Sequence, residues 1–371
     1  MQRITMTIAG LAALAFMQPV TAAESVIDSS AGPIAIERMA DGLDEPWAVG
    51  FLPDGAYLVT ERDGRLWHFD AAGTRQEVTG VPQVYSSGQG GLLDILVPED
   101  FTESREVFLS YAVDQNGGAG TALGVGRLSE DASQLEDFRQ IFESAPGWSG
   151  GRHFGSRIAE GPEGHLFLSI GDRGDMDTAQ DLSNHNGTIV RINRDGSVPD
   201  DNPFVDEDGA QPEIWTWGNR NPQGLDFDND GRLWSNEHGP RGGDELNLIE
   251  RGNNYGWPLI GESEHYTGEP MQEGREMEGM ERPLVHWTPA LAPSGFTAYS
   301  GQAWPEWEGS LFNGSLQQDR IARIDPNADF AEESLQSPEM GRVREVREAP
   351  DGSIWFLSVH EGALFRMSPA E

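Results

Sequence analysis

Four short segments concentrate polar residues that a plain connecting loop does not need, namely 152–155, 171–175, 218–222 and 238–245. A histidine in such a loop can act as a general base when a carboxylate holds its second ring nitrogen and stabilises the imidazolium. His153 and Asp172 can form that pair, and Arg220 offers a planar set of donors for a quinone or carboxylate oxygen. Taken alone, the same residues also fit a structural histidine and a surface ion pair of Arg220.

The segment 238–245 also indicates a metal site. Its glycines and proline free backbone carbonyls to point inward, and it ends in Asp244 and Glu245. Hard oxygen ligands of this kind favour calcium over transition metals. The Asp-rich stretches 195–208 and 226–230 lack the spacing of an EF-hand loop, so we interpret them as solvated turns.

Composition excludes several classes of function. The 371 residues carry 62 acidic groups against 25 basic ones, for a formal charge of −37, and this charge repels nucleic acid. All the basic residues are Arg, which excludes Schiff-base lysines and a Walker-type phosphate loop. Cysteine is absent, so thiolate nucleophiles, disulfides and covalent c-type haem are excluded too. Redox chemistry would therefore need a bound organic cofactor or non-thiolate metal ligands.

Residues 1–23 match a secretory signal peptide, with Arg3, an apolar run over 8–16 and small residues at 21–23. The apolar run is too short to span a bilayer as a finished anchor. We therefore expect an exported protein, periplasmic or secreted, whose mature form has no membrane span. The remaining residues, 24–371, are expected to form a single catalytic domain.

An imperfect repeat must position the polar segments. A turn signal followed by a short β-prone run occurs six times, at 53–59, 103–111, 162–168, 230–234, 308–312 and 350–356. Recurrence of a small sheet unit at irregular intervals predicts an all-β fold, a six-bladed β-propeller, whose loops converge on a central channel. Two β-sandwiches would need a linker, and no low-complexity break is present. Helical periodicity is poor, and only 131–138 could hold a turn or two of helix.

The four polar segments, together with 253–258, resemble the soluble pyrroloquinoline quinone (PQQ)-dependent sugar dehydrogenases, and most closely the bacterial aldose sugar dehydrogenases. The likeness runs in order from about 43 to 367. It implies a six-bladed propeller in which His153 takes the proton of the sugar's anomeric hydroxyl and Asp172 orients the imidazole. Hydride would pass to the quinone C5, beside Arg220.

The resemblance also implies binding residues for PQQ and calcium. Arg220, Asn221 and Gln89 match positions that line the active site, and Arg342 and Arg344 match a pair that binds the cofactor's carboxylates. Tyr266 matches a further pocket position. The remaining matches are calcium ligands: the backbone carbonyls of Gly239 and Pro240 for the ion at the quinone, and Glu245 and Tyr255 for a second, structural ion.

One position departs from the family pattern. Where the family usually has a cofactor-binding lysine after a Ser-Leu pair, this chain has Gln317 after Ser315 and Leu316. Glutamine can hydrogen-bond a quinone or carboxylate oxygen but supplies no positive charge. We expect Arg320 to compensate for the missing charge.

The leading hypothesis is oxidation of aldose sugars to lactones, with electrons passed to an external acceptor because the chain cannot attach a c-type haem. Two alternatives remain open: a calcium-dependent propeller lactonase, and a non-enzymatic sugar-binding propeller. The protein is expected to be a monomer or a homodimer.

Overall fold

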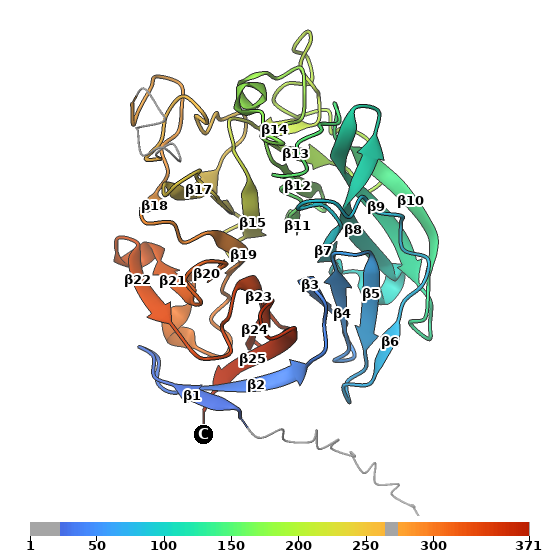
Figure 1. Cartoon of the computed structure of the whole chain (residues 1–371), viewed down its shortest axis with the longest axis vertical. Helices are drawn as coiled ribbons and strands as arrows, with labels where there is room; N and C mark the ends of the chain where they lie inside the picture. The colour runs from blue at the N-terminus through green and yellow to red at the C-terminus, as the bar shows by residue number, and fades with distance from the viewer. Residues whose placement is uncertain (1–22, 264–273, 371) are drawn as a thin grey trace, which may run out of the picture.

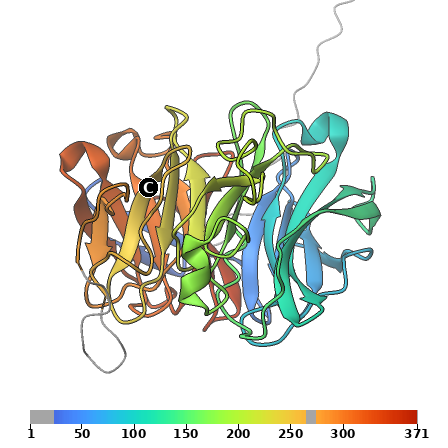
Figure 2. The same cartoon turned by 90° about the horizontal axis from the view of Figure 1, so that it is seen from above.

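Six antiparallel sheets surround a central shaft in the computed structural model, which describes residues 23–263 and 274–370 (Figure 1). Viewed from the side, the sheets stand next to one another as a short, thick ring (Figure 2). The predicted six-bladed β-propeller is therefore confirmed. The predicted signal peptide lies almost entirely outside the described residues. No helix in the two described ranges is long and apolar enough to cross a membrane.

Each blade is a meander of short strands. Blade 1 is β3 Pro46–Phe51, β4 Tyr57–Glu61, β5 Arg65–Phe69 and β6 Arg75–Glu77, and blade 2 is β7 Leu92–Leu96, β8 Glu106–Gln115, β9 Gly118–Leu128 and β10 Leu135–Glu143. Blade 3 is β11 Ile158–Glu160, β12 Leu166–Ile170, β13 Thr188–Ile192 and β14 Ile214–Thr216, and blade 4 is β15 Pro222–Phe227, β16 Leu233–Glu237, β17 Asp244–Ile249 and β18 Val285–Trp287. Blade 5 is β19 Pro293–Ala298, β20 Leu311–Ser315, β21 Ile321–Asp325 and β22 Ala331–Leu335.

Blade 6 closes the ring with both ends of the chain. It contains β23 Val343–Glu348, β24 Ile354–Ser358 and β25 Ala363–Pro369, and the N-terminal strands β2 Ile34–Ala40 and β1 Ser25–Ile27 complete it. Ile34 lies opposite Pro369, and Ile36 opposite Met367, in antiparallel register. Ile34, Ile36 and Met367 are fully buried, so the junction is sealed by apolar packing as well as by the hydrogen-bond ladder.

The first strand of each blade lines the shaft. These six strands, β3, β7, β11, β15, β19 and β23, contact one another around the ring. Each of the six turn signals falls between the first and second strand of its blade, as at Gly55, where φ is +82°. Glycine adopts this left-handed conformation without steric cost, so the turn chemistry was a reliable signal.

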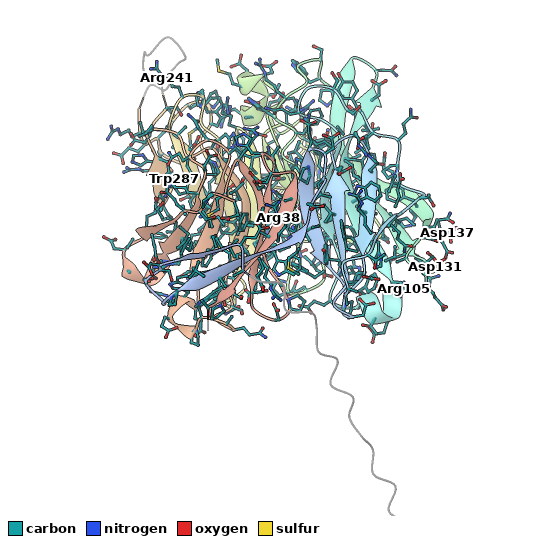
Figure 3. The ribbon with its side chains drawn as sticks, turned by 60° about the horizontal axis from the view of Figure 1, so that its bottom comes forward. Arg38, Arg105, Asp131, Asp137, Arg241 and Trp287 are labelled. Carbon is teal, nitrogen blue, oxygen red and sulfur yellow. The ribbon has the colours of Figure 1, made fainter. Side chains whose placement is uncertain are left out.

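The prediction that 131–138 could hold a turn or two of helix is wrong. Asp131 instead accepts hydrogen bonds from Ser129 and Ser133, which close a tight turn before β10 begins at Leu135. Asp137 has a φ of +53° at a bulge in that strand. Both acidic residues lie at the outer margin of the molecule (Figure 3). Side-chain capping of a turn and edge pairing therefore override the weak helical pattern. The α-helix of the described residues is the single turn α1 Phe101–Ser104, and short 3₁₀ turns are η1 Met176–Gln180, η2 Pro305–Trp307 and η3 Pro326–Ala328.

Candidate functional site

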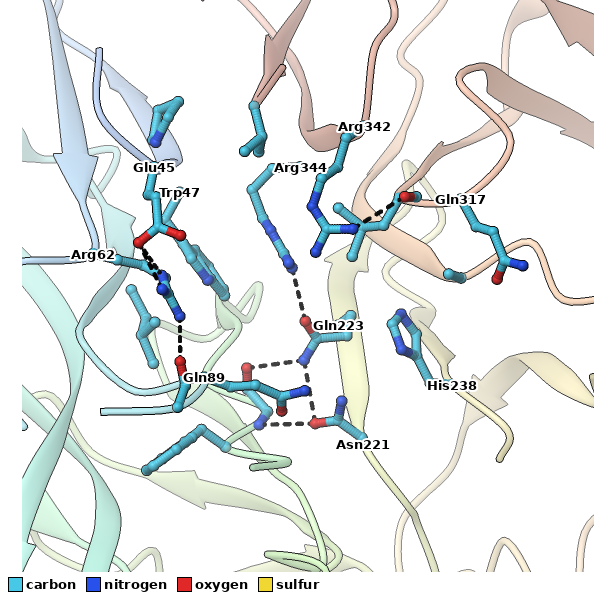
Figure 4. Close-up of a pocket in the computed structure, with 18 residues that line it drawn as sticks. Glu45, Trp47, Arg62, Gln89, Asn221, Gln223, His238, Gln317, Arg342 and Arg344 are labelled. Carbon is cyan, nitrogen blue, oxygen red and sulfur yellow. Dashed lines mark hydrogen bonds and ion pairs between the residues drawn. The ribbon is translucent and has the colours of Figure 1, made fainter. Parts of the chain in front are cut away.

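A cavity of about 560 Å³ occupies the mouth of the shaft where the first strands begin. All six blades contribute to its wall, because the connections between blades end at this face (Figure 4). The polar lining residues are Glu45, Arg62, Gln89, Asn221, Gln223, His238, Gln317, Arg342 and Arg344. The volume is in the range that small-molecule and cofactor sites usually have.

His153 and Asp172 form a buried pair beside this cavity. The Nδ1 atom of His153 lies 2.6 Å from Oδ1 of Asp172, so the ring donates its Nδ1 proton to the carboxylate and Nε2 is the basic nitrogen. Nε2 has no hydrogen-bond partner among the described residues. The backbone of His153 is strained, with a φ of +54°, and its N–H donates to Oε1 of Gln89, a lining residue. The loop is thus held in a conformation that aims the imidazole.

Asp172 is fixed from several sides. Its carboxylate accepts the Gly174 N–H at 2.7 Å and the indole N–H of Trp257 at 2.9 Å, in addition to His153. Its own N–H donates to the carbonyl of Arg220, which ties two of the polar segments together. An added Cβ at Gly171 would lie 2.3 Å from the His153 carbonyl oxygen, so only glycine permits this approach. Trp257 belongs to the segment 253–258 that carries the family resemblance, but the sequence alone did not indicate its contact with Asp172.

The pair should act as a base at mildly acidic pH. Burial lowers the pKa of His153 below its usual value, the hydrogen bond to Asp172 opposes this, and the charge of Arg220 adds to the lowering. A base works only in its neutral form, so activity should be retained as pH falls to about 6.5 and lost only below it. The measurement is the pH profile of kcat/KM for the loaded enzyme. An acid limb centred above pH 7 would contradict this assignment.

Glu237, at the end of β16, shapes the Arg220 segment and was missed by the sequence analysis. Its buried carboxylate accepts the backbone N–H groups of Arg220 and Asn221, and also the side-chain amide of Asn219. Burial raises the pKa of Glu237, and these three bonds lower it again in part. Its position at the end of a buried strand could have marked Glu237 as a functional residue. Only the structure, however, shows that it binds the loop of Arg220.

Arg220 has no carboxylate partner among the described residues, so a surface ion pair does not account for it. It donates from Nη1 to the His238 carbonyl at 3.0 Å, and its guanidinium carbon lies 5.4 Å from the centre of the Trp257 ring. Asn221 lines the cavity and accepts the Gly155 N–H at 3.2 Å. The structure therefore brings His153, Asp172, Arg220 and Asn221 to one mouth of the shaft.

Cationic side chains gather on the opposite wall of the cavity. Arg342 and Arg344 line it, and neither has a carboxylate partner within the described ranges. Desolvation and the charges of Arg157, Arg342 and Arg62 lower the pKa of Arg344 to about 9. In a chain with a formal charge of −37, crowded and unpaired arginines indicate a site for an anion.

The charge that Gln317 lacks is not supplied by Arg320. Gln317 does line the cavity, but Arg320 is absent from its wall and forms an ion pair with Glu332 on β22. The expectation for Arg320 is therefore wrong, because Glu332 in the same blade holds its guanidinium. Arg62 lines the cavity instead, and is held by Glu45 at 2.6 Å and by the Gly88 carbonyl.

Two groups of oxygen atoms lie at the positions expected to bind cations, and no cluster of three or more carboxylate or imidazole side chains that could hold a metal occurs within 23–263 and 274–370. Gly239 and Pro240 come directly after His238, which lines the cavity, and their carbonyls accept no hydrogen bond from any described residue. The Gly239 N–H is held by Asp244 at 2.8 Å, which turns the loop. Main-chain oxygens left free in this way are suitable ligands for calcium.

The second group surrounds Glu245, which lies opposite Glu237 in the β16–β17 pairing. Burial and then the charge of Glu237 raise the pKa of Glu245 well above its usual value. Asn219 and Asn247 each donate an amide proton to one of these carboxylates, and the buried Oδ1 of each finds no hydrogen-bond partner among the described residues.

Tyr255 can serve a cation only through its carbonyl. Its hydroxyl is already bonded to the backbone of Leu248 and Glu250. Its carbonyl oxygen accepts no hydrogen bond from the described part of the chain. Tyr266 lies outside the described residues.

Residues 43–366 match the family model described as glucose/sorbosone dehydrogenase. The chain is 41% identical over 363 residues to aldose sugar dehydrogenase YliI of Escherichia coli, covering 95% of this chain and 98% of that protein. The crystal structure of the soluble E. coli aldose sugar dehydrogenase in its apo form superposes with a TM-score of 0.87 at 41% identity, covering 91% of this chain and all of that one. The PQQ-bound aldose sugar dehydrogenase of Streptomyces coelicolor superposes with a TM-score of 0.74 at 28% identity, covering 90% of this chain and 98% of that one.

Proposed function

Because the chain belongs to the glucose/sorbosone dehydrogenase family, we propose that it is a PQQ- and calcium-dependent oxidoreductase that converts aldose sugars to lactones. One observation carries this proposal: a His–Asp pair lies beside the same cavity that Arg342 and Arg344 line, and His153 is hydrogen-bonded to the lining residue Gln89. The pair is suited to removing a proton, and the two arginines to holding an anionic cofactor. Neither a lactonase nor a plain sugar binder needs both.

The proposed cofactor fits the cavity wall. PQQ is a flat heterocycle with several carboxylates, and Arg342 and Arg344 supply forked donors for such groups. Trp47 adds an aromatic surface next to Arg344, whose guanidinium carbon lies 5.7 Å from the centre of the indole ring. Asn221, Gln223 and Gln317 offer amide groups for the remaining polar edges.

The chain's own residues then divide the work. His153 takes the proton of the anomeric hydroxyl at Nε2, while Asp172 keeps the ring in the right tautomer and stabilises the imidazolium. Arg220, set by Glu237, presents its guanidinium to the reacting oxygens. Bound PQQ would supply the acceptor for the hydride of the sugar carbon, and bound calcium would supply a Lewis acid at the quinone carbonyl. We propose Gly239 and Pro240 as ligands of that ion, and Glu245 and Tyr255 as ligands of a second, structural one.

We further propose that the protein works in the periplasm or outside the cell and passes its electrons to an external acceptor. The support is the leader-like composition of residues 1–23 and the lack of cysteine for a covalent haem.

The test is an absorbance titration of the purified protein with PQQ in the presence of calcium, followed by dye reduction with a panel of aldoses. We expect saturable binding and sugar-dependent reduction. Lactone hydrolysis without quinone would favour the lactonase instead, and binding of sugar without quinone absorbance would favour a plain binder.

Arg344→Gln should weaken PQQ binding about 10- to 100-fold, because a charge-assisted bond contributes roughly 1.5–3 kcal/mol. Arg366→Gln is the matched control, since Arg366 pairs with Glu37 on the outer side of blade 6. Equal affinity of the Arg344 variant and wild type would remove Arg344 from the cofactor site.

A further inference from the structure

A buried ion network crosses the shaft beneath the cavity. It consists of Asp94 on β7, Arg157 just before β11, and Glu345 and Arg347 on β23. Asp94 and Glu345 are fully buried, and Arg157 is only 2% exposed. Arg157 pairs with both carboxylates, while Arg347 lies 3.1 Å from Asp94. Two positive and two negative charges balance, which is what burial of ions at this depth requires.

Arg157 also reaches the residues that form the cavity floor. Its Nε donates to the carbonyl of Gln223 at 2.6 Å, and its Nη2 donates to the carbonyl of Arg344 at 3.1 Å. Its guanidinium carbon lies 4.1 Å from the centre of the Trp47 ring. Gln223, Arg344 and Trp47 all line the cavity, whereas Arg157 does not (Figure 4).

The floor residues depend on one another. Arg344 donates from Nη1 to Oε1 of Gln223 at 2.9 Å, and the Gln223 amide in turn lies 3.3 Å from Oδ1 of Asn221. Arg157 holds the backbones at both ends of the Arg344–Gln223 bond. Only a planar fork can bond two carbonyls and two carboxylates at once, because the donors of a lysine all sit on one nitrogen.

We propose that Arg157 is a positioning residue for cofactor binding: its guanidinium fixes Arg344, Gln223 and Trp47 and thereby sets the affinity for the anionic quinone. This inference rests on the proposed function. Removing Arg157 would free the floor and would also leave Asp94 and Glu345 opposed by Arg347 alone. The resulting buried negative charge lies beneath the place where an anion must bind. Both effects weaken binding.

Arg347 provides a matched control within the same network. It donates to Asp94 and to the Ile95 carbonyl, but it has no hydrogen bond to Gln223 or Arg344. It lines a separate hollow of about 900 Å³ at the other mouth of the shaft. Losing Arg347 removes the same charge from the network as losing Arg157, yet it leaves the floor contacts in place. The two variants therefore separate positioning from general damage to the ion network.

The experiment compares Arg157→Met, Arg157→Lys and Arg347→Met with wild type. The Kd for PQQ is measured by absorbance titration with calcium present, and the melting temperature is measured without PQQ. We expect both methionine variants to melt earlier than wild type. Arg157→Met should bind PQQ about tenfold or more weakly, as expected when the supporting partner of a binding group is lost. Arg157→Lys should recover only part of that affinity, and Arg347→Met should stay within about threefold of wild type.

Two results would overturn the inference: a folded Arg157→Met with the wild-type Kd, or an Arg347→Met that weakens binding as much as Arg157→Met does. If Arg157→Met does not fold, Arg157→Lys decides, because it keeps the charge and loses the fork. A wild-type Kd for the lysine variant then rejects positioning by the guanidinium. Failure of wild type itself to bind PQQ would reject the proposed function, and this outcome is distinct from any difference among the variants.

Discussion

Replacement of His153 by alanine is expected to lower kcat by about 10²- to 10⁴-fold, the usual contribution of a positioned general base. Neither of the titratable groups next to His153 can replace it as the base. Asp172 is buried and already accepts three hydrogen bonds, and His238 donates its Nε2 proton to the Pro293 carbonyl. Burial lowers the pKa of His238 to about 3, and its ring is committed to that bond. The measurement is steady-state dye reduction with saturating PQQ and aldose.

His185→Ala is the matched control for this variant. His185 is also buried and lies 3.2 Å from a carboxylate, that of Glu213, but it belongs to the outer part of blade 3 and does not line the cavity. We expect it to cost stability while leaving kcat per folded molecule unchanged. The PQQ Kd of His153→Ala should also stay near the wild-type value. A loss of kcat below tenfold would assign the base to another group.

Removal of calcium is expected to abolish turnover and to lower the melting temperature of the PQQ-free protein by about 5 °C. The second effect follows from Glu237 and Glu245, two neighbouring carboxylates whose charged forms burial disfavours, with the charge of Glu237 acting further against that of Glu245. An ion present at 100 times its Kd stabilises the folded state by about 2.7 kcal/mol, and about 2 °C per kcal/mol suits a chain of this size. Melting with calcium and with a chelator tests this directly.

Two variants test whether calcium stabilises the protein by binding at Glu245. Glu245→Gln should melt at the same temperature with and without calcium, because a ligand carboxylate is lost. Asp195→Asn should keep the full calcium shift, since Asp195 closes an exposed turn by accepting from Ser197. A calcium shift that survives in Glu245→Gln would move the structural ion elsewhere. Metal content measured on the purified variants gives the same distinction without any enzyme assay.

The sequence was informative where a local pattern determines the structure. A turn residue such as Gly55 needs only its neighbours, so six repeated turns predict six blades. The polar segments around His153 and Arg220 precede the first strands β11 and β15, and the segment around Asp172 follows the second strand β12. Antiparallel pairing within the blades then places all three at one mouth. Residues that bind partners on other blades have no such local pattern in the sequence.

Arg157 contacts Glu345 on another blade, and Trp257 reaches Asp172 from a distant loop. Neither the spacing nor the residue type predicts these partners. Hydrogen-bond partners of this kind could not be predicted, because they depend on how the chain folds and not on local residue patterns. The expectation for Arg320 failed for a different reason, because its partner Glu332 lies in the same blade and draws it away from the cavity.

The pairing of β2 with β25 has a consequence for biosynthesis. Ile34 leaves the ribosome long before its partner Pro369, which lies at the far end of the propeller sequence. Until then β2 can pair only with the short strand β1, and joining it to β25 is slow because a very long loop must close. A prematurely terminated chain that stops before β25 can therefore form individual blades but not a ring. Every nascent molecule stays open, and prone to aggregation, until β25 has been translated.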